Sequence, residues 1–375
     1  MIMSVFSIFK FIKDRLATVS DVSIQGSASP ISCNVKKGCC YNSTQIPDLS
    51  LLIEKAFPSK NGLYPHEILM LSYATDYKID LNDNYYQSFW CDKYGVTNPI
   101  SILESLIKRG FIVNGGVRQT IEKFTISKLK EELKSIKEKT VGSRQDLIDR
   151  LLSMPEDILE QKYLVRYFQL TALGKNELQE NQYVSYLHKN NFMSIWELNQ
   201  MLHKEHKNYR DCIWEYFNKK SLEEASRYNF GIYRCIRFDM GRFLLEENKF
   251  KEALYFFCEV FKYDNSLLDN SAKYFLEEKD EQSFFIELNE RVASFFEDIM
   301  QAPKLLKYFA DIHKKMQVSE LEFQSLLWDN FNRIKTEFCM FTNEELVKII
   351  GYEQQHKSKE LKSLYNSAKR REKSK

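Results

Sequence analysis

The sequence has 375 residues, of which 43% are hydrophobic and 14% aromatic, enough to fill the cores of two or three domains. The 54 basic and 52 acidic residues leave a formal net charge of +2, which excludes a polycation that coats nucleic acid by charge alone. Only 12 Gly and 7 Pro occur, and this scarcity predicts a mainly α-helical protein.

The eight Cys residues lack the spacing of a disulfide framework or of a zinc ribbon. A reduced, cytoplasmic protein is therefore expected. No apolar run approaches the ~20 residues that a membrane-spanning helix needs, so no transmembrane segment is expected. Residues 1–16 predict an amphipathic helix that docks on the protein, on a partner or on a membrane surface. Residues 17–48 are polar and predict a flexible linker.

Residues 49–182 predict a small α+β domain. Pro65 opens a helix through Tyr73, and Asn98 caps a second helix that has Pro99 at its first position. Gly110 ends that helix, and residues 111–113 then predict a short strand before an Asn-Gly-Gly turn. A capped helix, a glycine stop and a strand in this order are typical of a winged-helix-like domain.

A second strand is predicted over 165–170, and Thr171 is expected to cap a helix over 172–180. This stretch resembles the wing strand and following helix of bacterial winged-helix proteins, through Tyr167, Leu170, Thr171, Gly174 and Leu178. We therefore expect the segment between the two strands to be inserted into one small sheet.

That inserted segment, residues 124–154, predicts two short helices around a tight loop. Thr125 and Ser143 are the expected N-caps, and Gly142 can take the positive φ that the loop needs. The apolar faces follow helical spacing. They consist of Ile126, Leu129, Leu133 and Ile136 on the first helix and Leu147, Ile148, Leu151 and Leu152 on the second.

The run from Gly142 to Leu151 resembles the second half of a SAP motif, and residues 129–133 resemble the first half. The arrangement is similar to SAP-containing proteins of Gram-positive bacteria and their phages. SAP modules are helix–loop–helix units that bind duplex DNA, and the resemblance implies phosphate contact by Arg144. The DNA-binding residues that it implies are Lys128, Lys130, Gly142, Ser143, Arg144 and Gln145. The alternative is a surface helical hairpin with chance similarity.

Residues 122–153 hold eight basic and six acidic side chains, a net of +2. Phosphate neutralisation dominates the affinity of most DNA-binding proteins, so weak to moderate, salt-sensitive binding is expected.

Residues 183–352 predict an irregular all-α domain. Residues 237–264 resemble one tetratricopeptide (TPR) repeat, with Gly241 as the small residue that lets two helices approach. Residues 353–375 predict a basic tail, whose last seven residues hold five basic and one acidic side chain. Such tails are usually solvated and disordered; contact with nucleic acid is the alternative.

No pattern for catalysis, metal binding or a cofactor stands out. His203 and His206 share a helix face and Cys212 follows downstream, but a clear fourth metal ligand is missing, and surface histidines are the favoured interpretation. We therefore expect a non-enzymatic protein that binds DNA through the SAP-like hairpin and an unidentified protein partner through its helical domain. The alternatives are a TPR-like interaction scaffold in which the hairpin is structural, and an enzyme of unrecognised type.

Overall fold

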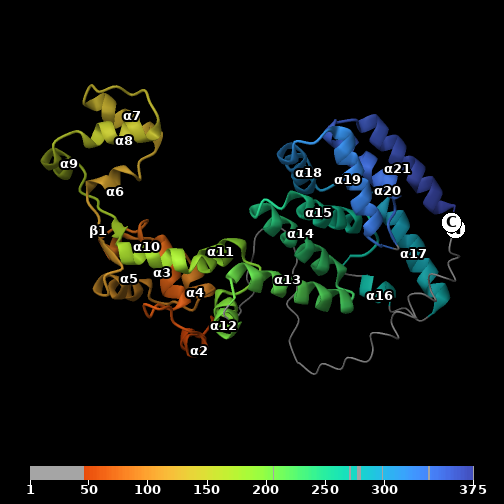
Figure 1. The fold of residues 1–375 in the computed structure, drawn as a ribbon, viewed down its shortest axis with the longest axis horizontal. Coiled ribbons are helices and arrows are strands. Elements are labelled where there is room, and N and C mark those ends of the chain that lie inside the picture. The colour runs from red at the N-terminus through yellow and green to blue at the C-terminus, as the bar shows by residue number, and fades with distance from the viewer. Residues whose placement is uncertain are drawn as a thin grey trace. The chain divides into compact units, whose positions relative to one another are not determined.

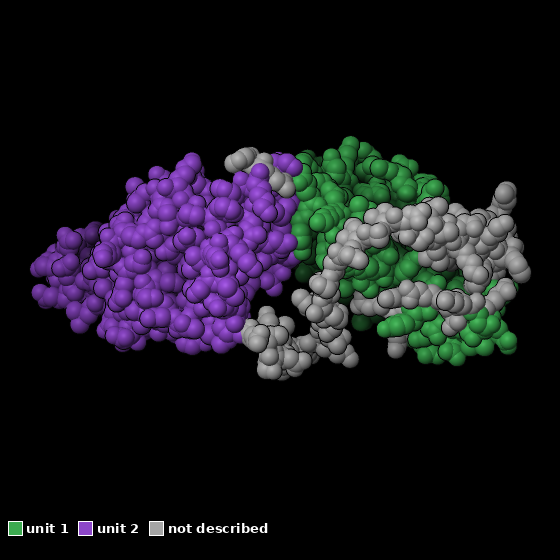
Figure 2. Space-filling model, turned by 90° about the horizontal axis from the view of Figure 1, so that it is seen from below, with its two compact units in different colours: residues 1–32, 213–375 green, residues 33–212 purple. Residues whose placement is uncertain are grey.

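The structure is a computed structural model that describes residues 46–205, 207–269, 272–276, 280–297, 299–336 and 338–374. The expected helix over 1–16, and the linker over 17–48 except its last three residues, lie outside these ranges. The chain forms two compact units, coloured separately in Figure 2. We call the described part of 33–212 the N-terminal unit and the described part of 213–375 the C-terminal unit. No helix in the described ranges is long and apolar enough for a bilayer span.

The fold is mainly helical, as predicted, with a small two-stranded sheet in the part that the structure describes. The N-terminal unit is shown in Figure 1 from red to green. Its elements are α2 (Leu49–Glu54), α3 (Pro65–Ala74), η1 (Leu81–Asp83), α4 (Phe89–Asp92), α5 (Pro99–Lys108), β1 (Ile112–Asn114), α6 (Val117–Ile121), α7 (Ile126–Ser135), α8 (Arg144–Leu152), α9 (Glu156–Lys162), β2 (Phe168–Leu170), α10 (Ala172–Glu180), α11 (Gln182–Asn190) and α12 (Ile195–Glu205).

Helix α3 lies in the core of the N-terminal unit. Pro65 occupies its first position, where a missing amide hydrogen costs nothing. The Glu67 carboxylate accepts a 2.9 Å hydrogen bond from the Tyr64 amide and so closes the first turn. Four successive residues, 68–71, are at most 1% exposed, as expected of a helix covered on all sides. Helices α5, α10, α11 and α12 pack against α3.

Helix α5 begins and ends as predicted. The Asn98 side chain accepts a hydrogen bond from the Ser101 amide, and Pro99 takes the first position. Gly110 follows the helix with φ of +78°, a conformation that glycine adopts at little cost. This turn directs the chain into β1.

Strands β1 and β2 pair antiparallel, with Ile112 opposite Leu170 and Asn114 opposite Phe168. Beyond the last pair, the Gly115 amide donates a 2.9 Å hydrogen bond to the Tyr167 carbonyl. The hairpin of α7 and α8 lies between these strands in sequence. Its predicted insertion into one small sheet is confirmed, and in Figure 1 helices α6 to α9 form a group of their own beyond β1.

Helix α10 approaches the start of β1 closely because of Gly174. A Cβ atom at this position would lie 2.3 Å from the Phe111 carbonyl oxygen, so only glycine fits. Thr171 caps the helix, as predicted, by accepting from the Gly174 amide at 3.1 Å, and its hydroxyl donates to the Gly110 carbonyl at 2.8 Å. The helix is thereby fixed to the strand that precedes the insertion.

The two units divide at 212/213, within α13 (Tyr209–Ser226), whereas the sequence placed the domain boundary at 182/183. Helices α11 and α12 belong to the N-terminal unit because their apolar faces pack on α3. Tyr183 and Val184 on α11 and Trp196 on α12 are each at most 4% exposed. The sequence shows continuous helix here and gives no sign of which core each helix joins.

The C-terminal unit is all helical in its described residues. After α13 it contains α14 (Phe230–Glu246), α15 (Phe250–Asp264), α16 (Ala272–Leu276), α17 (Glu281–Phe295), α18 (Pro303–Met316), α19 (Glu320–Arg333), α20 (Asn343–Gln354) and α21 (Ser358–Lys373). Helices α14 and α15 form the expected hairpin. A Cβ atom at Gly241 would lie 3.0 Å from the Phe257 ring, so this glycine lets the two helices approach.

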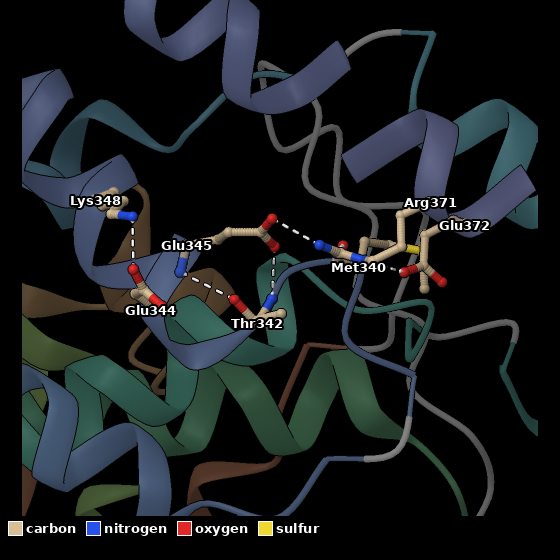
Figure 3. A network of polar contacts seen from close by, with 7 residues as sticks. All are labelled: Met340, Thr342, Glu344, Glu345, Lys348, Arg371 and Glu372. Atoms are coloured by element: carbon tan, nitrogen blue, oxygen red, sulfur yellow. Dashed lines mark hydrogen bonds and ion pairs between the residues drawn. The ribbon is translucent and has the colours of Figure 1, made fainter. Parts of the chain in front are cut away.

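The expectation of a disordered tail is wrong, because residues 358–373 form α21, which packs against α20. Leu361 and Ala368 are buried in this contact. Figure 3 shows how the basic end is held. Arg371 forms a 2.6 Å ion pair with Glu345, and its Nη2 donates to the Met340 carbonyl at 2.9 Å. Charge composition suggested a solvated tail, but the apolar residues at helical spacing decide the structure.

Candidate nucleic-acid interface

Two helix N-termini define one end of the inserted hairpin. The Thr125 hydroxyl caps α7 by accepting from the Lys128 amide at 3.2 Å. Ser143 and Asp146 form a reciprocal capping box at the start of α8, with hydrogen bonds of 3.2 and 2.8 Å. Both predicted N-caps are therefore confirmed. The remaining first-turn amides of each helix have no partner within the helix and carry partial positive charge.

Arg144 brings these two helix starts together. Its Nη2 donates to the carbonyl oxygens of Glu122, at 2.5 Å, and Phe124, at 3.3 Å, just before α7. Helices α7 and α8 therefore begin at the same end of the hairpin. Because the acceptors are neutral carbonyls, the guanidinium keeps its full positive charge while its position is fixed.

The loop between α7 and α8 is held in an extended path. Arg150 Nη1 donates to the carbonyls of Lys139, at 2.5 Å, and Val141, at 3.3 Å. Gly142 has φ of +137°, and a Cβ atom there would lie 3.0 Å from the Asp146 side chain. The predicted requirement for glycine in this loop is confirmed.

A small core joins the four helices α6 to α9. Four residues of the predicted apolar faces, Leu129, Leu133, Leu147 and Leu151, are each 0% exposed. Five more residues complete this core. They are Val117, Ile121, Ile148, Leu159 and Tyr163. The hairpin therefore folds around apolar residues of its own and of its two flanking helices.

A buried carboxylate lies within this group of helices. Glu132 of α7 receives hydrogen bonds from Lys162 Nζ at 2.6 Å, Lys128 Nζ at 2.9 Å and the Tyr163 hydroxyl at 2.9 Å. Burial alone would raise the pKa of Glu132, but these three donors outweigh burial and lower the pKa to about 2. The charge of Lys128 is thus shared with an internal partner.

The six residues that the SAP resemblance singled out are all exposed. Gly142, Ser143, Arg144 and Gln145 are consecutive and start α8, whereas Lys128 and Lys130 lie on α7. Gln145 Nε2 donates to Asp149 at 2.9 Å. No described residue forms an ion pair with Lys130, whose ammonium projects from α7 unneutralised.

A groove of about 480 Å³ adjoins the start of α8. Besides Arg144 and Gln145, it is lined by residues that follow α3, by residues of α6 and the turn after it, by β2 and by α10. These are Thr75, Gln119, Glu122, Lys123, Phe168, Gln169, Leu170 and Lys175. Lys175 and Gln169 could not be singled out from the sequence, because strand pairing brings them beside α8 from a later part of the chain.

Of the histidine pair that the sequence showed to share a helix face, the structure describes one member. The ring of His203 stacks on Phe57, with ring centroids 3.5 Å apart. His206 lies outside the described residues. Among the residues that the structure describes, no group of three or more metal-ligating side chains occurs.

Residues 120–153 match the SAP domain family. The match contains the end of α6 and the whole of α7 and α8, so this part of the chain is a SAP domain. SAP domains are generally DNA-binding modules. No curated protein and no solved structure matches the chain.

Proposed function

We propose that this protein is a non-enzymatic DNA-binding protein that contacts duplex DNA through the paired helix starts of its SAP domain. The observation that carries the proposal is the Arg144 contact with the residues before α7, which places two helix N-termini side by side in a SAP domain. Helix N-termini bind phosphate through free amides and through the helix dipole.

The six exposed residues have different roles in this proposal. Lys130 and Arg144 attract phosphates by charge, and Gln145 and the amides of the first turn of α8 supply hydrogen bonds. Gly142 and Ser143 shape the loop and the helix start. Lys128 contributes less charge because it is paired with Glu132.

Binding is weak to moderate and sensitive to salt. Few cations face the DNA, and each phosphate contact that is formed releases condensed counterions. Fluorescence anisotropy of the full chain with an AT-rich duplex at low salt measures the affinity.

Lys130→Ala tests the interface, because Lys130 carries charge and holds no described contact. We expect a loss of about tenfold in affinity near 50 mM salt. The slope of log K against log salt should become less steep by about one. Lys219→Ala removes another exposed charge, on α13, and should bind as wild type. The double variant Lys130→Ala, Arg144→Ala should lose more, after circular dichroism has shown that it is folded. Unchanged affinity in that folded double variant would exclude this face of the SAP domain.

A protein-interaction scaffold is the second candidate function. Leu321 is 80% exposed and Trp328 is 42% exposed. They lie seven residues apart on α19 and therefore share one face of the helix. Leu321→Ser with Trp328→Ala should abolish capture of a partner that the wild-type chain retains. Absence of duplex binding at every salt concentration, together with such a loss, would favour this function.

Four finer expectations remain predictions that belong to this proposal. They are a winged-helix-like fold for the region around the SAP domain, a TPR-like hairpin of α14 and α15, a cytoplasmic location and an origin in Gram-positive bacteria or their phages. The pairing of β1 with β2 around the SAP domain supports the first, and the Gly241–Phe257 approach supports the second.

A further inference from the structure

The groove beside α8 has a lining that suits a polyanion. Lys123, Arg144 and Lys175 contribute three positive charges, against the single carboxylate of Glu122. The lining also contains four uncharged hydrogen-bonding side chains. These are Thr75, Gln119, Gln145 and Gln169.

The three cations differ in how far their charges are neutralised by neighbouring carboxylates. Lys123 forms an ion pair with Asp76, so much of its charge is neutralised. Arg144 is held by backbone carbonyls and retains its charge. Lys175 is exposed on the first turn of α10, and no described residue forms an ion pair with it. Arg144 of α8 and Lys175 of α10 therefore supply the unneutralised positive charge of the groove.

Two contacts connect the SAP domain to the elements on the other side of the groove. The Thr120 hydroxyl donates a 2.7 Å hydrogen bond to the Val165 carbonyl, which connects α6 to the segment leading into β2. The Lys123–Asp76 pair connects the turn after α6 to the residues that follow α3. The SAP domain is thus held against the sheet, and the groove exists before any ligand binds.

The lining favours a sugar–phosphate backbone over unpaired bases. Single-stranded nucleic acid usually stacks its bases on exposed aromatic rings. The aromatic residue of this lining, Phe168, is only 1% exposed. Charged and amide side chains instead match phosphate and sugar oxygens.

We propose that this groove binds the backbone of the same duplex that the SAP domain contacts, with Lys175 and Gln169 as contact residues. The inference rests on the proposed function and extends it. The DNA-binding surface then continues from the start of α8 across β2 to α10, and the region into which the SAP domain is inserted takes part in binding.

The test uses the full chain, a 20-base-pair duplex, a single strand of the same sequence and a series of salt concentrations. Lys175→Gln should weaken duplex binding about tenfold near 50 mM salt and make the slope of log K against log salt less steep by about one. Gln169→Ala should weaken duplex binding with an unchanged slope, because it removes hydrogen bonds but no charge. Lys108→Gln, an exposed lysine of α5 outside the groove, serves as the control and should bind as wild type.

The outcomes separate this inference from the proposed function. If Lys130→Ala weakens binding but Lys175→Gln and Gln169→Ala do not, the groove inference fails and the SAP interface stands. If Lys175→Gln weakens duplex binding but Gln169→Ala does not, the effect is one of long-range charge, and the groove inference fails. If both groove variants weaken binding of the single strand as much as that of the duplex, the ligand is single-stranded nucleic acid and the inference is overturned. If wild type binds no duplex, the proposed function itself fails.

Discussion

Lys162 of α9 places its ammonium nitrogen 2.6 Å from the carboxylate of Glu132 on α7. This ion pair joins the last helix of the inserted region to the first helix of the SAP hairpin. Glu132 is 8% exposed, so its charge depends on its three donors. The pair therefore connects the stability of the SAP domain to pH.

The low pKa of Glu132 predicts acid sensitivity. A carboxylate with a pKa of about 2 in the folded state, against an ordinary value of 4.5, stabilises the fold fully above about pH 4.5. This stabilisation, at most about 3 kcal/mol, is lost as the pH falls from there toward 2. Glu132→Gln should lower the free energy of unfolding at pH 6, and the difference from wild type should shrink toward pH 2.

Urea unfolding at several pH values measures this difference. Glu131→Gln, an exposed neighbour on the same helix, is the matched control and should change the free energy of unfolding by less than about 0.5 kcal/mol. A constant difference between wild type and Glu132→Gln across this pH range would contradict the assignment.

Gly142→Ala should destabilise the SAP domain. The φ of +137° at Gly142 is unfavourable for any residue with a Cβ, and the added atom would also crowd Asp146. We expect a loss of about 1–3 kcal/mol in the free energy of unfolding, measured by denaturant titration. Gly116→Ala, at a position with φ of −86° and more open space, should cost only a few tenths of a kcal/mol. Equal effects of the two variants would show that the loop tolerates a side chain.

Gly241→Ala should destabilise the C-terminal unit. The new methyl group would meet the Phe257 ring at 3.0–3.3 Å, and Phe257 is itself stacked on Tyr308. Overpacking of this kind costs about 1–3 kcal/mol. The control is Gly351→Ala on α20, where the added methyl group has open space and helix propensity should stabilise the unit by up to about 1 kcal/mol. Thermal unfolding should shift in opposite directions for the two variants.

Arg371→Gln should loosen the C-terminal helix. The change removes the ion pair with Glu345, whose pKa is raised by burial but lowered overall by the bonds from Arg371 and Thr342. We expect faster amide hydrogen exchange over 358–373 with little change in the N-terminal unit. Lys373→Gln, which removes an exposed charge two residues later, should leave the exchange rates as in wild type. Unchanged exchange in Arg371→Gln would mean that packing alone holds α21.

Local patterns allowed much of the SAP domain to be predicted. Thr125, Ser143 and the apolar stripes act within a few residues, so the sequence shows them directly. The role of Arg144 in joining two helix starts could not be predicted, because its acceptors are backbone carbonyls some twenty residues away. The burial of Glu132 was missed for a related reason, since Lys162 and Tyr163 reach it from a helix beyond the motif.

The pairing of β1 with β2 was predicted from two short strand patterns, but the groove was not. Lys175 becomes part of the groove only because Gly174 lets α10 lie against the start of β1. At the basic end of α21 the sequence-based prediction was itself wrong. There, five positive charges in seven residues suggested disorder, whereas burial of Leu361 and Ala368 fixes a helix.

The hydrogen bond from the Gly115 amide to the Tyr167 carbonyl holds the two ends of the inserted region together. The two ends of the inserted region emerge side by side, so a two-residue turn could replace residues 116–166 and leave β1 and β2 as a simple hairpin. The inserted region, with its SAP domain, can thus be removed or added without a change in the strand pairing around it. A surrounding domain of this kind could exchange one inserted domain for another while keeping its own fold.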